Sequence, residues 1–176
     1  MKRFAYIAAI LFLCSGSTAT ISNAEEMELS VEIPQLNVSE YHRPYVGIWI
    51  EDSKNQHVRN LAVWYQMREG KEGHGTKWLP DLRQWWRKSG RTLDVPVDGV
   101  TSATRPVGKQ TLTFTDSDPH LKGLAAGNYT LVVEAVREVG GREMIKIPFT
   151  WPASASQQAS KKGSRELGMV ELSIKP

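Results

Sequence analysis

The sequence predicts a mainly β protein, an antiparallel immunoglobulin-like β-sandwich with one short inserted helix. Runs of strand length, in which apolar and polar residues alternate, recur along the chain at hairpin spacing. Two of these runs flank Val139-Gly140-Gly141, and a glycine pair between strands is a hairpin signal. Only residues 77–90 have a helical pattern. A small β-barrel is the alternative fold, and the pattern gives no sign of a second domain.

The first 24 residues have the organisation of a secretory signal peptide. Met1-Lys2-Arg3 is followed by an apolar run over 4–14 and by small and polar residues up to Ala24. The apolar run is too short to anchor the chain in a bilayer. A lipoprotein centred on Cys14 is the alternative, but the preceding Leu-Phe-Leu lacks the small residue expected before a lipidated cysteine. We therefore expect cleavage after Ala24 and a single periplasmic domain over 25–176.

Removal of this leader changes the composition of the chain. Cys14 is the only cysteine, so neither a disulfide nor a thiolate metal site is expected. The loss of Lys2 and Arg3 reduces the basic residues from 22 to 20 against 19 acidic residues, a net charge of +1. A nearly neutral chain gives no support to nucleic-acid binding.

Seven segments have strand patterns, with β-branched and aromatic residues set among polar ones. They are 27–33, 43–50, 58–67, 110–115, 128–138, 142–151 and 168–174. Residues 70–76 are rich in glycine and charge, and 153–162 is a low-complexity stretch of Ala, Ser, Gln and Lys. We expect both segments, and 116–127, to be loops.

The helical segment 77–90 has Pro80 near its start and Gly90 at its end, the usual positions of these residues. Its tryptophans are part of a set of six, and core packing is the default interpretation of so many indoles. Trp85 and Trp86 point about 100° apart on a helix, so both cannot be buried against one surface. We expect one of them to be available for stacking on a planar ligand.

Common metal-binding and hydrolase patterns are missing. The four histidines show no ligand spacing with other His, Asp or Glu residues, and there is no His-Glu-x-x-His sequence. Ser102 lacks the Gly-x-Ser-x-Gly surroundings of a hydrolase nucleophile. Glu134 and Glu138 fall on one face of a strand, which we expect to be solvated. Neither a metal centre nor a hydrolase site is expected.

Residues 98–104 form the one compact motif, Asp-Gly-Val-Thr-Ser-Ala-Thr, which as composition alone is a turn and a polar loop. Its order resembles the flavinylation signature Asp-x-x-(Ser/Thr)-(Gly/Ser/Ala)-Ala-Thr of exported proteins that carry FMN through a threonine phosphoester. The matching positions are Asp98, Thr101, Ser102, Ala103 and Thr104, and the commoner form of the signature has Gly in place of Ser102.

The resemblance implies that a magnesium-dependent flavin transferase takes FAD, leaves FMN on Thr104 and releases AMP. Small neighbours such as Ser102 and Ala103 let the threonine hydroxyl approach a phosphoryl group. Asp98 to Ala103 then serve mainly to make that hydroxyl recognisable to the transferase. Arg105 is next in the chain and is a candidate partner for the phosphate, with Lys109 a weaker one.

A wider resemblance covers nearly all of the mature chain. The order of the Trp-rich helix, the motif through Arg105-Pro106, Gly-Lys-x-x-Leu at 108–112 and the run 126–138 is similar to DUF2271, a family of predicted periplasmic proteins. This resemblance implies an association with flavin transferases and with PepSY-type membrane proteins that move electrons across the inner membrane. The chain departs from the pattern at 116–120, where a tighter Asp-Gly-rich turn is expected.

Our leading hypothesis is a periplasmic electron-transfer flavoprotein that holds FMN on Thr104, stacked on Trp85 or Trp86, and receives electrons from a PepSY-type partner. The alternative is a non-redox immunoglobulin-like binding module that uses its Trp face as a contact surface. A substrate-converting flavoenzyme is a third hypothesis, for which His74 and His120 are the available acid–base residues.

Overall fold

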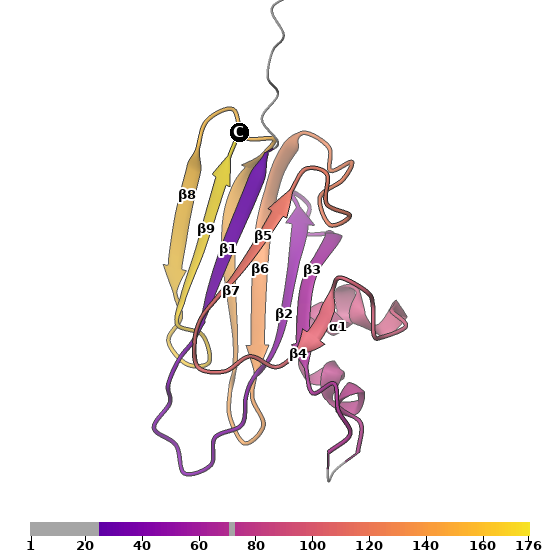
Figure 1. Cartoon of the computed structure of the whole chain (residues 1–176), viewed down its shortest axis with the longest axis vertical. Coiled ribbons are helices and arrows are strands. Elements are labelled where there is room, and N and C mark those ends of the chain that lie inside the picture. Colours follow the sequence, from indigo (N-terminus) through magenta and orange to yellow (C-terminus); the bar gives the residue numbers. More distant parts are fainter. Residues whose placement is uncertain (1–24, 71–72) are drawn as a thin grey trace, which may run out of the picture.

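The computed structural model describes residues 25–70 and 73–176 (Figure 1). The predicted signal peptide and its cleavage site after Ala24 lie outside the described residues. Within them, no helix is both long and apolar enough to cross a membrane.

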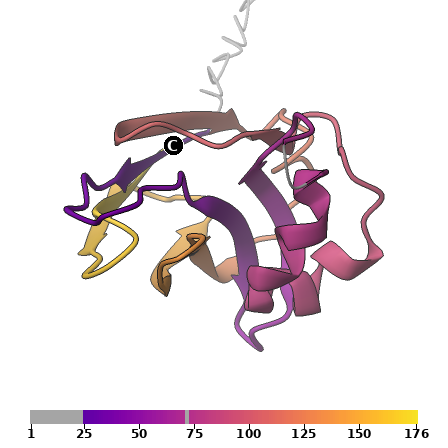
Figure 2. The same ribbon diagram turned by 90° about the horizontal axis from the view of Figure 1, so that it is seen from below.

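Two β-sheets form a sandwich, which confirms the predicted fold class (Figures 1 and 2). The four-stranded sheet has the order β5-β1-β9-β8 and the five-stranded sheet the order β4-β3-β2-β6-β7. The strands are β1 (Glu26–Ile33), β2 (Tyr45–Asp52), β3 (His57–Tyr65), β4 (Thr101–Ala103), β5 (Gly108–Thr115), β6 (Gly127–Val136), β7 (Arg142–Trp151), β8 (Gln157–Lys162) and β9 (Met169–Lys175). Both sheets have free edge strands, so the barrel alternative does not apply.

The main core lies between the sheets and follows from the alternation of apolar residues. In β1 the side chains of Met27, Leu29, Val31 and Ile33 are buried, because every second residue faces the opposite sheet. The neighbouring strand β9 contributes Val170, Leu172 and Ile174 in the same way; Leu172 lies beside Leu29 in the pairing.

The outer face of the five-stranded sheet is covered by a helical segment, as Figure 2 shows from below. Residues of β2, β3 and β6 on this face form a second core with the segment, so these strands are buried on both sides. The members of this second core are Trp49, Val63, Tyr65, Leu79, Leu82, Trp85 and Val132.

The predicted helix 77–90 is broken into three short pieces. A 3₁₀ helix η1 (Gly75–Asp81) precedes α1 (Arg83–Lys88), and a further 3₁₀ turn η2 (Gly90–Thr92) follows. Leu82, between η1 and α1, has ψ 69° and so leaves the helical conformation, which re-aims the side chains on either side of it.

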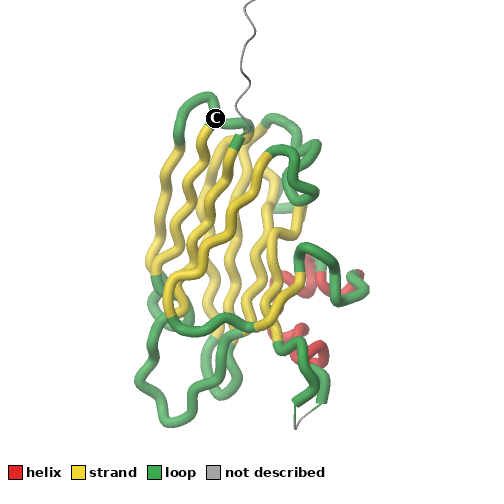
Figure 3. Tube along the Cα trace, viewed as in Figure 1, coloured by secondary structure: helices red, strands yellow, loops and turns green. Residues whose placement is uncertain are grey.

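Two segments predicted as loops contain strands (Figure 3). Residues 101–103 form β4, which pairs with β3 in parallel, the only such pair among the described strands. Residues 157–162 form β8, an edge strand paired with β9. The side chains of β8 are almost all exposed, so its sequence carries no alternating apolar signal.

The expectation that Glu134 is solvated is wrong. Its side chain has no exposed surface because the helical segment covers this part of the sheet. The carboxylate accepts hydrogen bonds from the backbone N–H groups of Gln84 and Trp85 and from Nε of Arg142. Glu134 therefore binds α1 to the sheet.

Candidate functional site

The last residues of the motif form an edge strand of the five-stranded sheet. Ser102 lies beside Trp64 in the parallel pairing of β4 with β3. One further bond, from the Thr104 N–H to the Tyr65 carbonyl oxygen at 3.2 Å, extends the ladder past Ala103. Thr104 is therefore held at a fixed position beside the end of β3.

The hydroxyl groups of the motif have different surroundings. Thr101 Oγ1 donates to the carbonyl oxygen of Val97 (2.9 Å), and Ser102 Oγ accepts a bond from Nη2 of Arg105 (3.2 Å). Within the described residues, the Thr104 hydroxyl makes no hydrogen bond, although the residue is half-buried. Asp98 is exposed in the turn that precedes the strand.

The turn is fixed to the other sheet by His120. Nε2 of this histidine lies 3.1 Å from the Gly99 carbonyl oxygen, and its ring lies 5.1 Å from the ring of Phe114 on β5. Gly99 has φ +70°, a conformation that favours glycine. His120 thus supports the motif, whereas His74 is exposed and lies 3.9 Å from a carboxylate oxygen of Glu69. Neither histidine lines the cavity beside Thr104.

Thr104 is the one residue of the predicted site that lines a cavity of about 620 Å³ at the end of the five-stranded sheet. A volume of this size is ordinary for the binding site of a cofactor. The lining residues are His42, Arg43, Tyr45, Gln66, Gly70, Gly73, Trp78, Asp81, Thr104, Val136, Arg137, Glu138 and Val139.

Aromatic rings and charges of both signs line this cavity. The Trp78 indole is 42% exposed, and the Lys77 ammonium lies 4.7 Å from its ring centroid. Burial raises the pKa of the Tyr45 hydroxyl, which donates to the Gly75 carbonyl oxygen at 3.3 Å. Arg43 is an exposed cation of the same lining. The cavity can therefore accept a molecule with a planar ring and hydrogen-bonding groups.

Arg105, the predicted phosphate partner, has a different environment from Thr104. Its guanidinium carbon lies 5.3 Å from the centroid of the Trp64 ring, and its Nη2 is bonded to Ser102. Arg105 is not among the residues that line the cavity. In this position it fixes the conformation of the motif strand.

Trp85 and Trp86 lie in separate environments. Trp85 has no exposed surface and donates from Nε1 to Asn60 at 2.9 Å. Its ring is packed so closely between Gly47 and Gly90 that a Cβ on Gly90 would lie 2.4 Å from it. Neither Trp85 nor Trp86 lines the cavity at Thr104.

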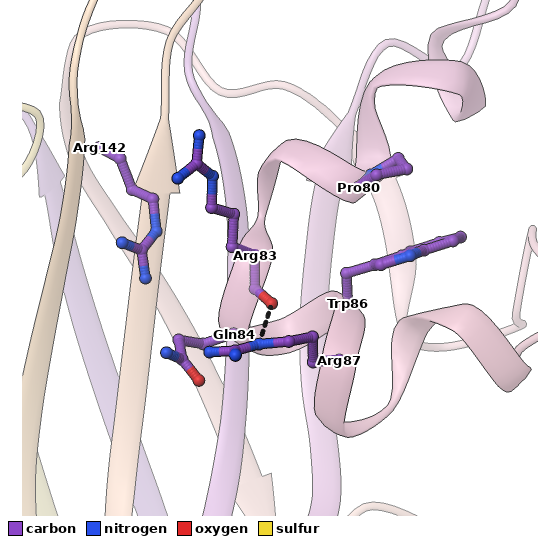
Figure 4. Close-up of a pocket in the computed structure, with 6 residues that line it drawn as sticks. All are labelled: Pro80, Arg83, Gln84, Trp86, Arg87 and Arg142. Atoms are coloured by element: carbon purple, nitrogen blue, oxygen red, sulfur yellow. Dashed lines mark hydrogen bonds between the residues drawn. The ribbon is translucent and has the colours of Figure 1, made fainter.

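Trp86 lines a second, open pocket of about 390 Å³ on the outer side of the helical segment (Figure 4). This pocket is cationic, with Arg83, Arg87 and Arg142 around Gln84 and Pro80. As Figure 4 shows, Nε of Arg87 donates to the Arg83 carbonyl oxygen within the helical turn, at 3.3 Å.

Trp78 and the cavity residues of β2 and β6 are absent from the predicted site. A regular helix would place Trp78 on the same buried face as Leu82 and Trp85. The break at Leu82 removes this relation. Trp78 is exposed at the cavity, while Leu82 and Trp85 are buried. Among the described residues, no group of three or more His, Cys, Asp or Glu side chains is arranged to hold a metal ion.

Comparisons with known proteins give a family and little else. No curated protein matches the sequence. Among solved structures, human GIVD cytosolic phospholipase A2 in complex with methyl gamma-linolenyl fluorophosphonate is 11% identical, with a TM-score of 0.32. The match covers 88% of this chain but only 17% of the phospholipase chain, and so low a score supports no conclusion about fold or function. The model of a family described as "Predicted periplasmic protein (DUF2271)" matches residues 26–169. The chain, with this match over most of its length, belongs to the DUF2271 family of predicted periplasmic proteins.

Proposed function

We propose that this protein is a periplasmic electron-transfer flavoprotein that carries FMN covalently on Thr104. The observation that supports the proposal is the position of Thr104. It is the last residue of a sequence that resembles a flavinylation signature, and it also lines a cavity of about 620 Å³. The proposed attachment residue therefore borders a space large enough for the cofactor.

The residues around Thr104 fit such a group. The hydroxyl stands at the end of an edge strand, where a modifying enzyme has access to it. The hydroxyl groups of Thr101 and Ser102 are engaged in hydrogen bonds, so the Thr104 hydroxyl is the one that the motif leaves available. Trp78 and Tyr45 supply aromatic surface in the same cavity. FMN would supply reversible electron transfer there.

The attachment reaction exchanges one phosphate bond for another. The Thr104 oxygen forms a bond to the FMN phosphorus of FAD, the phosphoanhydride bond breaks, and AMP leaves while the hydroxyl loses its proton. A magnesium-dependent flavin transferase is the enzyme of this step, and a PepSY-type membrane protein is the proposed electron donor. A covalent bond prevents loss of the cofactor by diffusion outside the cytoplasm.

Mass spectrometry of the protein co-expressed with a flavin transferase tests the proposal. The wild-type chain should gain the mass of one FMN minus water, and Thr104→Ala should abolish the gain. Thr113→Ala, at an exposed threonine on β5, the next strand along the chain, is the matched control and should keep the mass gain. An unmodified wild-type chain would overturn the proposal.

The cationic pocket around Trp86 supports a second candidate, a non-redox binding module. Three arginines beside a partly exposed indole are suited to contact with an anionic partner. The two functions predict different colours, because a purified, transferase-treated flavoprotein is yellow and a binding module is colourless.

A further inference from the structure

The cavity at Thr104 extends across the end of the five-stranded sheet. Thr104 lies beside Tyr65 on β3, Tyr45 begins the next strand, β2, and Val136 lies opposite Tyr45 on β6. Neighbouring strands are about 4.8 Å apart, so Val136 and the adjoining Arg137 lie roughly 14 Å from Thr104. A molecule bonded to Thr104 must be elongated to reach that end.

Trp78 gives the cavity an aromatic wall. The indole is held in place because the next residue of η1, Leu79, is fully buried in the second core. Its own ring nevertheless remains 42% exposed. A large, firmly anchored aromatic ring that stays exposed beside a cavity is suited to stacking on a planar ligand.

Arg137, which also lines the cavity, does not offer it a free donor. The residue is 7% exposed, and its Nε donates to Oε2 of Glu166 at 2.8 Å. Ala135, two residues earlier in the chain, packs in the core between the sheets, and alternation places the Arg137 side chain on that same face. The guanidinium is therefore used to hold Glu166, and Trp78 is the side chain of the cavity that is free to recognise a ring.

We propose that Trp78 forms the stacking wall of the subsite for the isoalloxazine ring of the flavin. The phosphate stays at Thr104, and the ring stacks on the exposed indole in the same cavity. An indole in contact with the ring quenches flavin fluorescence, which makes this contact measurable. The inference rests on the proposed function.

Free riboflavin, which has no phosphate, tests the subsite without the covalent bond. Titration of riboflavin into the Thr104→Ala protein, followed by quenching of flavin fluorescence, should give saturable binding. Adding Trp78→Ala to this protein should weaken binding roughly tenfold or more, since stacking is lost. Trp86→Ala is the matched control in the other pocket and should leave the affinity for riboflavin unchanged. The absence of saturable binding, or equal affinity with and without Trp78, would overturn the subsite.

The flavinylated protein gives a second measurement. Trp78→Ala should keep the full FMN mass gain but show a several-fold increase in flavin fluorescence, because the quenching indole is removed. Trp86→Ala, in the other pocket, should leave the fluorescence of the bound flavin unchanged. A melting curve establishes that both variants are folded.

The two proposals fail in different ways. A wild-type chain that takes up no FMN but binds riboflavin overturns the covalent function and leaves the subsite standing. An FMN adduct whose fluorescence is the same in the wild type and in Trp78→Ala overturns only the subsite.

Discussion

Glu51 is a carboxylate with no exposed surface on the outer face of β2. It accepts hydrogen bonds from Nε1 of Trp49 (2.9 Å) and from the ammonium of Lys146 (2.7 Å), and it forms an ion pair with Lys88 (2.8 Å). Burial opposes ionisation of Glu51, but these three donors outweigh it and lower the pKa of the carboxyl below its ordinary value of 4.5.

This lowered pKa predicts acid sensitivity. A carboxyl whose pKa is lower in the folded chain stabilises the fold above the unfolded pKa, near 4.5, and the stabilisation is lost as the pH falls through the folded value. Glu51→Gln should cost about 1–3 kcal/mol at neutral pH and flatten the loss of stability in acid. Urea unfolding at a series of pH values measures both effects. Glu28→Gln, on the exposed side of β1, is the control; if it flattens the profile equally, Glu51 is not the cause.

At the level of single residues, the sequence predicts one part of the site and misses another. Thr104 is identified by its neighbours in the chain, because the motif is a short local pattern. Trp78 and Val136 are brought to the same cavity by folding, from a 3₁₀ turn and from the end of β6. Glu134 is misjudged for the same reason, since nothing in its strand indicates that α1 covers it.

At the scale of elements, α1 is stabilised by packing because a helix of six residues has little stability of its own. Trp85 supplies that packing, with Gly47 and Gly90 leaving room for its ring. Trp85→Ala should therefore destabilise the fold by about 3–5 kcal/mol in urea unfolding. Trp78→Ala, in the preceding 3₁₀ turn, should change stability by less than about 0.5 kcal/mol. Equal losses for the two variants would contradict the division between a tryptophan buried in the core and one that lines the cavity.

Elements with a strong internal pattern are the ones that the sequence predicts well. The strand 142–151 has the predicted bounds, β1 begins one residue earlier than predicted, and β9 is shifted by one residue at each end. β4 and β8 are missed because edge strands need hydrogen bonds from one neighbour and little burial, so their composition is that of a loop. The break at Leu82 depends on the sheet below it, which local propensity does not describe.

For the whole molecule, the sequence predicts two layers but not the order of strands within them. β1 pairs with β5 and β9, whose residues are far away in the chain, and β5 to β6 and β7 to β8 cross between the sheets. Such pairings depend on the shape and register of complete faces. The site is a product of this arrangement, because the cavity lies where the ends of β3, β4, β2 and β6 meet.

The exposed edge strand β8 has a consequence for the behaviour of the protein at high concentration. Its outer edge offers unpaired backbone groups to any other strand, and its Lys161 and Lys162 are exposed on it. Charged side chains on an edge discourage the addition of a strand from another molecule. The two lysines thus act against self-association of the protein through this edge.

Replacing both lysines by threonine should therefore produce concentration-dependent association, because threonine favours strand pairing and carries no charge. Sedimentation velocity over a range of protein concentrations measures the effect. The pair Lys54→Thr and Lys122→Thr removes the same charge from turns away from the edge and should leave the sedimentation of the protein unchanged. Association of both double variants to the same extent would assign the effect to net charge alone. In the expected case, two side chains on one strand set the concentration at which this protein can be stored without aggregating.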